Sequence, residues 1–464
     1  MMRRSFGILA VVCLVFSGLP LLAQGGGTGN SGWSFDWDIE GKFHYRDSDE
    51  SVVTNPFPFR DLGIPLPPGQ DFALLTTVDP GEHFEVSTLT LYLDVTKGEF
   101  FEAKAKVDFI DRYDRNPTSE DREVDIDELW LRFGRETEPG RLPDGTGGYL
   151  KIGKFPHFER QDDRHLESYG LVSTAFNRFE DSGIELGLDL GRHFYLKGSY
   201  TQGNPLFIRD PNALAGDNGL ARSLAAPNLV PELGSGLVIF YDAEVENIEF
   251  GSDPELGLGA GFRIGETWTL DVLLWAYQRD LAETAPIRGT LYGGDLDILS
   301  GPINTSILPF EGNKKEEFGA NVWFYSGGLS LFAQLVDGEI AKLPRDGWEV
   351  EASYAFDLPL QWSIRGKQLF TYIQPAIRVS ELNTAIPITT AVLVPVVGAT
   401  EPRGDQHFPA ITARWDWEKI DYGLRLGIYE GIDLTLEFSD NTTTTLGGVD
   451  ISHDELLTTL RWKI

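Results

Sequence analysis

The sequence predicts an all-β chain that forms a transmembrane antiparallel β-barrel of sixteen strands, with eighteen strands as the alternative. Three observations predict this class. Apolar and polar residues alternate over long runs, short and long connections alternate along the chain, and the first residues have the composition of an export signal. Strong helical periodicity is absent from the sequence.

The first 23 residues predict a signal peptide. A short basic lead (MRRSFG) precedes an apolar core (ILAVVCLVF), and a stretch of small and apolar residues ends at Ala23. We expect residues 24–32 to form a short lead and residues 33–464 to form the barrel. The only cysteine, Cys13, lies in the signal peptide, which excludes a disulfide framework in the exported chain. No later stretch reaches the roughly 18 to 20 apolar residues of a membrane-spanning helix.

Alternation with a period of two begins at residues 33–46 (WSFDWDIEGKFHYR) and recurs to the last residue. In an extended strand this places the apolar side chains on one face and the charged ones on the other. Many runs hold 9 to 12 residues, enough for a tilted strand to cross roughly 25 Å of hydrocarbon, whereas strands of soluble sandwiches are nearer about five or six residues. The pattern predicts one face toward lipid and one toward water.

Connection lengths predict the strand count. Short links fall near residues 96–99, 191–193, 265–267, 326–328 and 430–431, and long polar links fill 46–85, 157–182, 202–253, 280–314, 381–406 and 441–451. Bacterial outer-membrane barrels have short periplasmic turns and long extracellular loops. Sixteen strands satisfy this parity if residues 237–250 belong to the fourth outer loop and residues 407–429 form one strand with a bulge near Glu418. Eighteen strands result if both segments are read as membrane strands, but the long links at 280–314 and 381–406 then fall on the periplasmic side.

Strand ends carry aromatic residues suited to the headgroup level of a bilayer, at Trp33, Tyr45, Trp268 and Trp462. The last strand, in which Leu456, Leu460 and Ile464 share a face with Trp462, resembles the C-terminal signature of bacterial outer-membrane barrels, although the final residue in that class is most often Phe.

Residues 149–191 resemble the corresponding region of porins in the phosphate-selective O and P group. The resemblance is carried by the Gly153–Lys154 pair before a long loop and by the step from Asp181 to Gly183 at the next strand. It implies a bacterial outer-membrane porin. Anion selectivity would need a dominant ring of basic residues, and the inward positions here carry both signs, so phosphate specificity does not follow.

Two sets of charged residues are the candidate site. The pore-lining candidates are Lys42, Asp94, Lys104, Lys106, Asp108, Arg132, Lys151, Glu185, Lys197, Arg263, Glu317, Glu349, Glu351, Arg425 and Arg461. The loop at 157–182 follows the fifth predicted strand, where general porins place a constriction loop. Its candidates are Arg160, Asp162, Asp163, Arg164, His165 and Glu167. Contact of this loop with lipopolysaccharide through divalent ions is the alternative.

Composition and the absence of known motifs exclude several classes of function. The formal net charge of −32 disfavours nucleic acid as a partner. No hydrolase, zinc-protease or nucleotide-binding motif occurs, the seven histidines show no metal-binding spacing, and we expect no enzyme activity, cofactor or metal. Expected partners are outer-membrane lipids, lipopolysaccharide and small polar solutes or ions, with a homotrimer possible. We expect passive diffusion through a charged lumen. The alternatives are a soluble exported carbohydrate-binding or hydrolytic protein and a plugged barrel that acts as a surface receptor.

Overall fold

The structure is a computed structural model. It describes residues 32–49, 51–54, 74–78, 81–110, 124–161, 164–176, 180–203, 244–245, 254–280, 287–288, 314–340, 343–360, 362–383, 386–387, 412–413, 416–444 and 450–464. The predicted signal peptide lies outside the described residues, as does nearly all of the lead that follows it.

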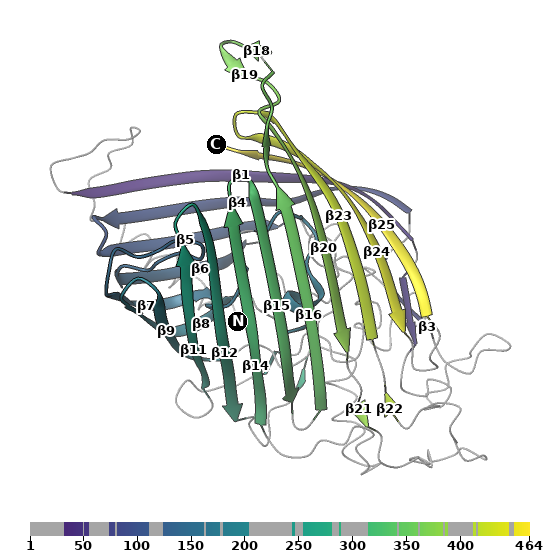
Figure 1. Cartoon of the computed structure of the whole chain (residues 1–464). Helices are drawn as coiled ribbons and strands as arrows, with labels where there is room; N and C mark the ends of the chain where they lie inside the picture. Colours follow the sequence, from purple (N-terminus) through teal and green to yellow (C-terminus); the bar gives the residue numbers. More distant parts are fainter. Residues whose placement is uncertain are drawn as a thin grey trace, which may run out of the picture.

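Sixteen strands form the wall of a closed antiparallel barrel (Figure 1). They are β1 (Trp33–Ser48), β4 (Gly81–Lys97), β5 (Phe101–Ile110), β6 (Val124–Gly134), β7 (Gly147–Pro156), β8 (Glu180–Leu190), β9 (Phe194–Thr201), β11 (Glu255–Gly265), β12 (Trp268–Asp280), β14 (Lys314–Ser326), β15 (Leu329–Ile340), β16 (Leu343–Tyr354), β20 (Tyr372–Asn383), β23 (Asp416–Tyr429), β24 (Ile432–Thr444) and β25 (Asp450–Lys463). Each pairs with the next in the chain, and the predicted sixteen-stranded barrel is confirmed.

The barrel closes where β25 pairs with β1. The last residue completes this seam, because the backbone N–H of Ile39 donates to the carbonyl oxygen of Ile464 at 2.8 Å and the N–H of Ile464 donates back at 3.0 Å. Gly41 lies directly under the indole of Trp462, and a Cβ built on it would lie 2.3 Å from Nε1 of that ring. The seam leaves no open sheet edge, which a sheet in hydrocarbon could not tolerate.

The two ends of the barrel differ. At the turn end, which carries the C-terminus, most connections span two or three residues, such as 98–100, 327–328 and 430–431. At the opposite loop end lie most of the long connections, including the small pairs β2 (Ser51–Thr54) with β3 (Leu74–Val78), β10 (Glu244–Val245) with β13 (Ile287–Arg288), and β21 (Ile386–Pro387) with β22 (Thr412–Ala413). Strand parity therefore matches the sequence-based expectation.

Two connections at the turn end are longer than predicted. Residues 355–371 continue β16 through β17 (Phe356–Asp357) into a hairpin of β18 (Ser363–Ile364) and β19 (Lys367–Gln368), which projects beyond the wall at the top of Figure 1. Residues 135–146 join β6 to β7. The expected bulge near Glu418 was wrong: the pairing of β23 with β20 is unbroken there, and the register shift lies between Gly427 and Tyr429.

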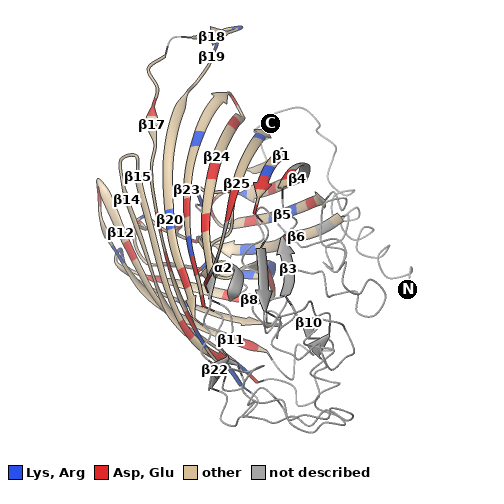
Figure 2. Ribbon diagram, turned by 90° about the vertical axis from the view of Figure 1, so that its right-hand side faces the viewer, with Lys and Arg blue, Asp and Glu red and all other residues tan. Residues whose placement is uncertain are grey.

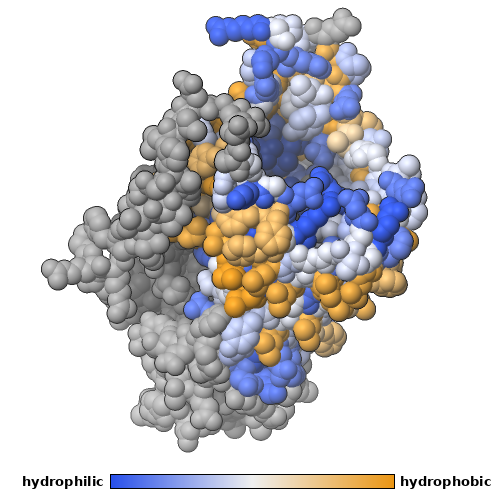
Figure 3. Space-filling view, turned by 90° about the vertical axis from the view of Figure 1, so that its left-hand side faces the viewer, coloured by the Kyte–Doolittle hydropathy of each residue, from blue (hydrophilic) through white to orange (hydrophobic). Residues whose placement is uncertain are grey.

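The wall has an apolar outer face and a charged inner face. Leu258 and Leu274 are 71% and 61% exposed on the outside, whereas Asp421 and Glu317, which lie on inward positions, are at most 1% exposed. Hydrophobic side chains gather in a band across the outer face in Figure 3, and Figure 2 shows acidic and basic residues along the strands. Soluble proteins have the opposite distribution. The apolar face therefore suits contact with lipid and the charged face contact with water.

Candidate functional site: the barrel lumen

The described parts of the connection after the fifth wall strand, residues 157–161 and 164–176, lie in the lumen at the loop end. Its short helix α2 (Leu171–Ala175) contacts β16 and β20. Glycines of the wall make room for the connection: a Cβ on Gly423 would lie 2.2 Å from Cδ2 of Leu166, and one on Gly347 would lie 3.2 Å from Cγ2 of Val172. The absence of side chains at these two glycines therefore leaves room for Leu166 and Val172 of the connection.

A carboxylate on β24 anchors the middle of this loop. The backbone N–H of Glu167 donates to Oε2 of Glu437 at 2.8 Å, and the N–H and hydroxyl of Ser168 both donate to Oε1 of the same carboxylate. Arg378 on β20 donates to the carbonyl oxygen of Ser168 at 3.0 Å and also pairs with Asp421 on β23 at 2.7 Å. Backbone groups buried without secondary-structure partners are thereby satisfied.

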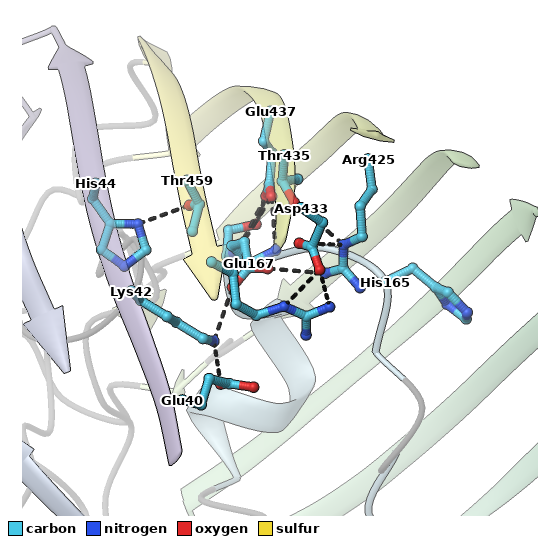
Figure 4. Close-up of polar contacts among 12 residues, drawn as sticks. Glu40, Lys42, His44, His165, Glu167, Arg425, Asp433, Thr435, Glu437 and Thr459 are labelled. Carbon is cyan, nitrogen blue, oxygen red and sulfur yellow. Dashed lines mark hydrogen bonds and ion pairs between the residues drawn. The ribbon is translucent and has the colours of Figure 1, made fainter. Parts of the chain in front are cut away.

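The side chain of Glu167 lies between two cations from different parts of the wall (Figure 4). Its carboxylate is 2.9 Å from Nζ of Lys42 on β1 and 2.9 Å from Nη2 of Arg425 on β23. Burial alone would raise the pKa of this loop carboxyl, but the two cations outweigh burial and hold the pKa well below its usual range. Glu167 therefore stays ionised and connects the loop to opposite sides of the β25–β1 seam.

Other predicted loop residues are arranged around this anchor. His165 contacts Glu351 on β16, with Nδ1 2.9 Å from Oε1, and Arg164 stacks 4.2 Å above the ring of Tyr169. Arg160 pairs with Glu180 at the start of β8. Asp162 and Asp163 lie outside the described residues.

A second connection enters the lumen from the turn end, and the sequence analysis missed it. Glu136, in the β6–β7 connection, lies 2.9 Å from Nζ of Lys151 and 3.3 Å from Nζ of Lys197. Thr137 donates to Asp189 at 2.8 Å. Gly140 lies against the ring of Tyr325 on β14, five strands away from β7 around the wall. The connection therefore reaches across the barrel mouth, and its unusual length at an otherwise short-turn end was the available sequence signal.

All fifteen pore-lining candidates have buried or half-buried side chains on wall strands. Most are in ion pairs, which are Lys42–Glu167, Lys104–Glu128, Lys106 with Asp108 and Asp127, Arg132–Glu102, Lys151 with Glu136 and Glu185, Lys197–Glu136, Arg263 with Asp189 and Asp271, Glu317 with Lys315 and Arg345, Glu351–Arg378, Arg425–Glu167 and Arg461–Asp433. Asp94 is opposite Lys104 in the β4–β5 register, and Glu349 faces Gly170 of the loop.

Exposure divides the lumen into a filled side and an open side. Charged side chains of β14, β16, β20 and β23 next to the loop are nearly all below 5% exposed, as Lys315, Glu351, Arg378 and Lys419 show. On the β25–β1–β4–β5–β6 side, Lys104, Arg461 and Lys42 retain 29%, 26% and 22% exposure. Among the described residues these three side chains are the more exposed part of the charged inner face, whereas Arg46, Glu128 and Glu455 on the same side are 3%, 6% and 2% exposed.

A closed wall with an apolar outer face and a charged inner face is the arrangement of a β-barrel that spans a membrane. Among the residues that the structure describes, no helix is long and apolar enough to cross a membrane.

Comparisons with known proteins place the barrel beside solved channels. The outer-membrane channel DcaP of Acinetobacter baumannii superposes with a TM-score of 0.49 and 9% identity, over 95% of this chain and 100% of that chain. OmpF of Salmonella typhi gives 0.45 and 10%, over 94% and 99%. OprB of Pseudomonas putida gives 0.44 and 9%, over 94% and 95%. No protein-family profile and no curated protein matches the barrel.

Proposed function

We propose that the protein is a porin that allows passive diffusion of small polar solutes or ions across the outer membrane. The observation that carries the proposal is the division of the lumen. The described part of residues 157–179 packs on β16 and β20 and reaches β1 through the Glu167–Lys42 pair, while the wall from β25 to β6 keeps partly exposed charges such as Lys104 and Arg461. Solute would pass between the loop and these strands.

The narrowest part of this path would be beside Glu167, whose carboxylate contacts Lys42 and Arg425 directly and so closes the gap between the loop and β1 at that point (Figure 4). Charges of opposite sign on opposite sides of a pore create a transverse field that orients polar solutes, and the charges at a constriction set ion preference. Because both signs line the open side, we propose weak charge selectivity. The resemblance of residues 149–191 to phosphate-selective porins is not extended to their specificity.

Single-channel recording in a planar bilayer tests the proposal, together with reversal potentials in unequal salt. The path itself is tested by cysteine labelling, since the chain has a single cysteine, at position 13 in the predicted signal peptide. In Lys104→Cys, an anionic methanethiosulfonate reagent should reduce the current. Lys419→Cys, at a residue whose side chain is 1% exposed behind the loop, is the matched control and should not respond. If the purified protein passes no single-channel current, the porin proposal is contradicted. If the reagent does not change the current of Lys104→Cys, the proposed path is contradicted.

A plugged barrel that acts as a surface receptor is the second candidate. Two observations favour it: connections enter the lumen from both ends, and most lumen charges are already paired. A sealed barrel would pass almost no current. If the wild-type protein is silent but a variant with a shortened 135–146 connection conducts, the receptor interpretation is favoured over the porin.

The environment of the barrel is proposed on the same basis. The outer apolar face would contact outer-membrane lipids, and the loop end would face lipopolysaccharide. One of the similar structures, OmpT of Vibrio cholerae, is described in a trimer form, with a TM-score of 0.44 and 8% identity over 93% of this chain and 99% of that chain. We propose a homotrimer for this barrel, to be tested by the mass of the detergent-solubilised particle in light scattering.

A further inference from the structure

Three metal-ligating side chains meet where the lumen loop leaves the wall. His157 directly follows β7, Asp181 is the second residue of β8, and Glu255 is the first residue of β11. One ligand atom from each lies within 4.8 Å of the other two, and all three residues are buried. Strand register explains the meeting, because Glu255 pairs with Thr201, and Thr201 pairs with Gly183 on β8. The three residues are far apart in the sequence, so their spacing does not predict that they meet.

Buried oxygens without partners point to a missing ligand at this place. Oε2 of Glu255 is 2.7 Å from Nζ of Lys315, but Oε1 has no hydrogen-bond partner among the described residues, although the side chain is fully buried. Thr201 lies between Glu255 and Gly183 in the strand ladder, and its buried hydroxyl also has no hydrogen-bond partner among the described residues. Buried polar atoms are normally satisfied by protein, water or a metal ion.

The ligands are also held in orientation. The Nε2 atom of His157 lies 3.9 Å from Oδ2 of Asp181, while Nδ1 on the other side of the ring lies 3.9 Å from Oε1 of Glu159. The ring packs edge-on against Tyr277, with centroids 5.0 Å apart. A ligating histidine commonly donates its second N–H to a carboxylate, and Glu159 lies on that side of the ring, although 3.9 Å is beyond hydrogen-bond distance.

The Asp181 carboxylate is oriented by backbone groups. The N–H of Ser182 donates to Oδ1 at 2.7 Å and the N–H of Gly203 donates to Oδ2 at 2.9 Å. Ligand atoms of a tetrahedral site with bonds of about 2.0–2.1 Å are roughly 3.3 Å apart, so small side-chain rotations would close the group around an ion.

We propose that His157, Asp181 and Glu255 form a binding site for a divalent transition-metal ion such as Zn²⁺. One imidazole nitrogen with two carboxylates suits such an ion, whereas Ca²⁺ and Mg²⁺ prefer oxygen ligands alone. Lys315 would keep its pair with Oε2 of Glu255, which leaves Oε1 as the ligand atom for the metal. His157 and Asp181 flank the lumen loop, so the ion would tie both ends of the loop to β11 and fix its position in the lumen.

Metal binding by the intact barrel tests the site. Tag-free protein, purified from outer membranes and freed of metal with a chelator, is titrated with Zn²⁺ by calorimetry and with Co²⁺ by visible absorption. We expect one Zn²⁺ per chain and the d–d bands of four-coordinate Co²⁺. His157→Gln and Glu255→Gln should weaken binding by at least about 100-fold. His165→Gln, a second buried histidine of the same loop, is the matched control and should bind as the wild type does.

Several outcomes would overturn the site. They are wild-type protein that binds no Zn²⁺, His157→Gln protein that binds as tightly as the wild type, or an equal loss in His165→Gln. Retention of the heat-modifiable folded band on gels shows that each variant has folded. If the variants do not fold, the Co²⁺ spectrum of the wild type still decides. Binding is read without current, so a silent barrel that binds Zn²⁺ contradicts the porin proposal and leaves the metal site intact.

Discussion

Replacing Glu167 by Gln is the sharpest test of the lumen loop. The substitution keeps the size of the side chain but removes the charge that faces Lys42 and Arg425 at 2.9 Å each. The pair with Arg425 is buried and is worth about 1.5–3 kcal/mol. The pair with Lys42, which is 22% exposed, contributes about 1 kcal/mol or less after solvent screening. Loop anchoring should therefore weaken by about 1.5–4 kcal/mol, or roughly 10- to 1,000-fold in the population of the displaced loop.

The backbone contacts of residues 167 and 168 with Glu437 do not depend on this charge, so the barrel should still fold. We expect noisier single-channel currents and a reversal potential in a KCl gradient that shifts toward anions, because two cations lose their counter-charge. Glu418→Gln, an exposed carboxylate on the same strand as Arg425, is the matched control. Identical reversal potentials and current noise in Glu167→Gln and the wild type would refute the reasoning.

The depressed pKa of the Glu167 carboxyl makes a pH prediction with a definite sign. A carboxyl whose pKa is lower in the folded protein contributes stability that is fully present above its ordinary value of about 4.3 and is lost only as the pH falls through the depressed value. Between pH 7 and about 4.5, the wild-type barrel should therefore not acquire the current noise of Glu167→Gln. Appearance of that noise in wild-type recordings at pH 5 would contradict the assignment.

Three further variants probe the wall and the turn end. Leu274→Arg places a charge on the outer apolar face and should cost about 2–4 kcal/mol in urea unfolding, whereas Phe194→Arg, at a strand end, should cost about 1 kcal/mol or less. Gly153→Ala should destabilise by about 1–3 kcal/mol or prevent folding, because its φ is +138° and a Cβ would lie 2.1 Å from a carbonyl oxygen of β6; an unaltered unfolding midpoint contradicts this. Glu136→Gln removes the shared partner of two lysines and should shift the reversal potential toward anions, and an unchanged value would place Glu136 outside the solute path.

Strand positions were predictable because they depend on local chemistry. A period of two over ten residues needs only the covalent geometry of the chain, and the parity of short and long connections needs only closure of the sheet. The loop after the fifth strand was also predicted as the residue range that contains Glu167. Its docking partners were not, since Glu437 and Arg378 lie more than 200 positions further along the chain and no spacing relates them to it.

The turn end shows the same limit from the other side. Glu136 lies in a connection with no alternation, so neither its approach to Lys151 nor its place across the mouth follows from a pattern. His157 looked isolated among seven scattered histidines, because only the pairing of β8, β9 and β11 brings Asp181 and Glu255 beside it. Contacts across a lumen depend on shear and tilt of the whole wall, which local sequence does not encode.

Wall glycines under the loop have a consequence for engineering. Gly423 accepts Leu166 and Gly347 accepts Val172, so the inner surface of the wall and the outline of the loop are complementary shapes. A graft of residues 157–179 into another barrel would meet side chains at these two positions and would be expelled from the lumen. A graft of the loop therefore needs glycine at both wall positions of the recipient barrel, and we expect the loop and these two wall positions to change together in evolution.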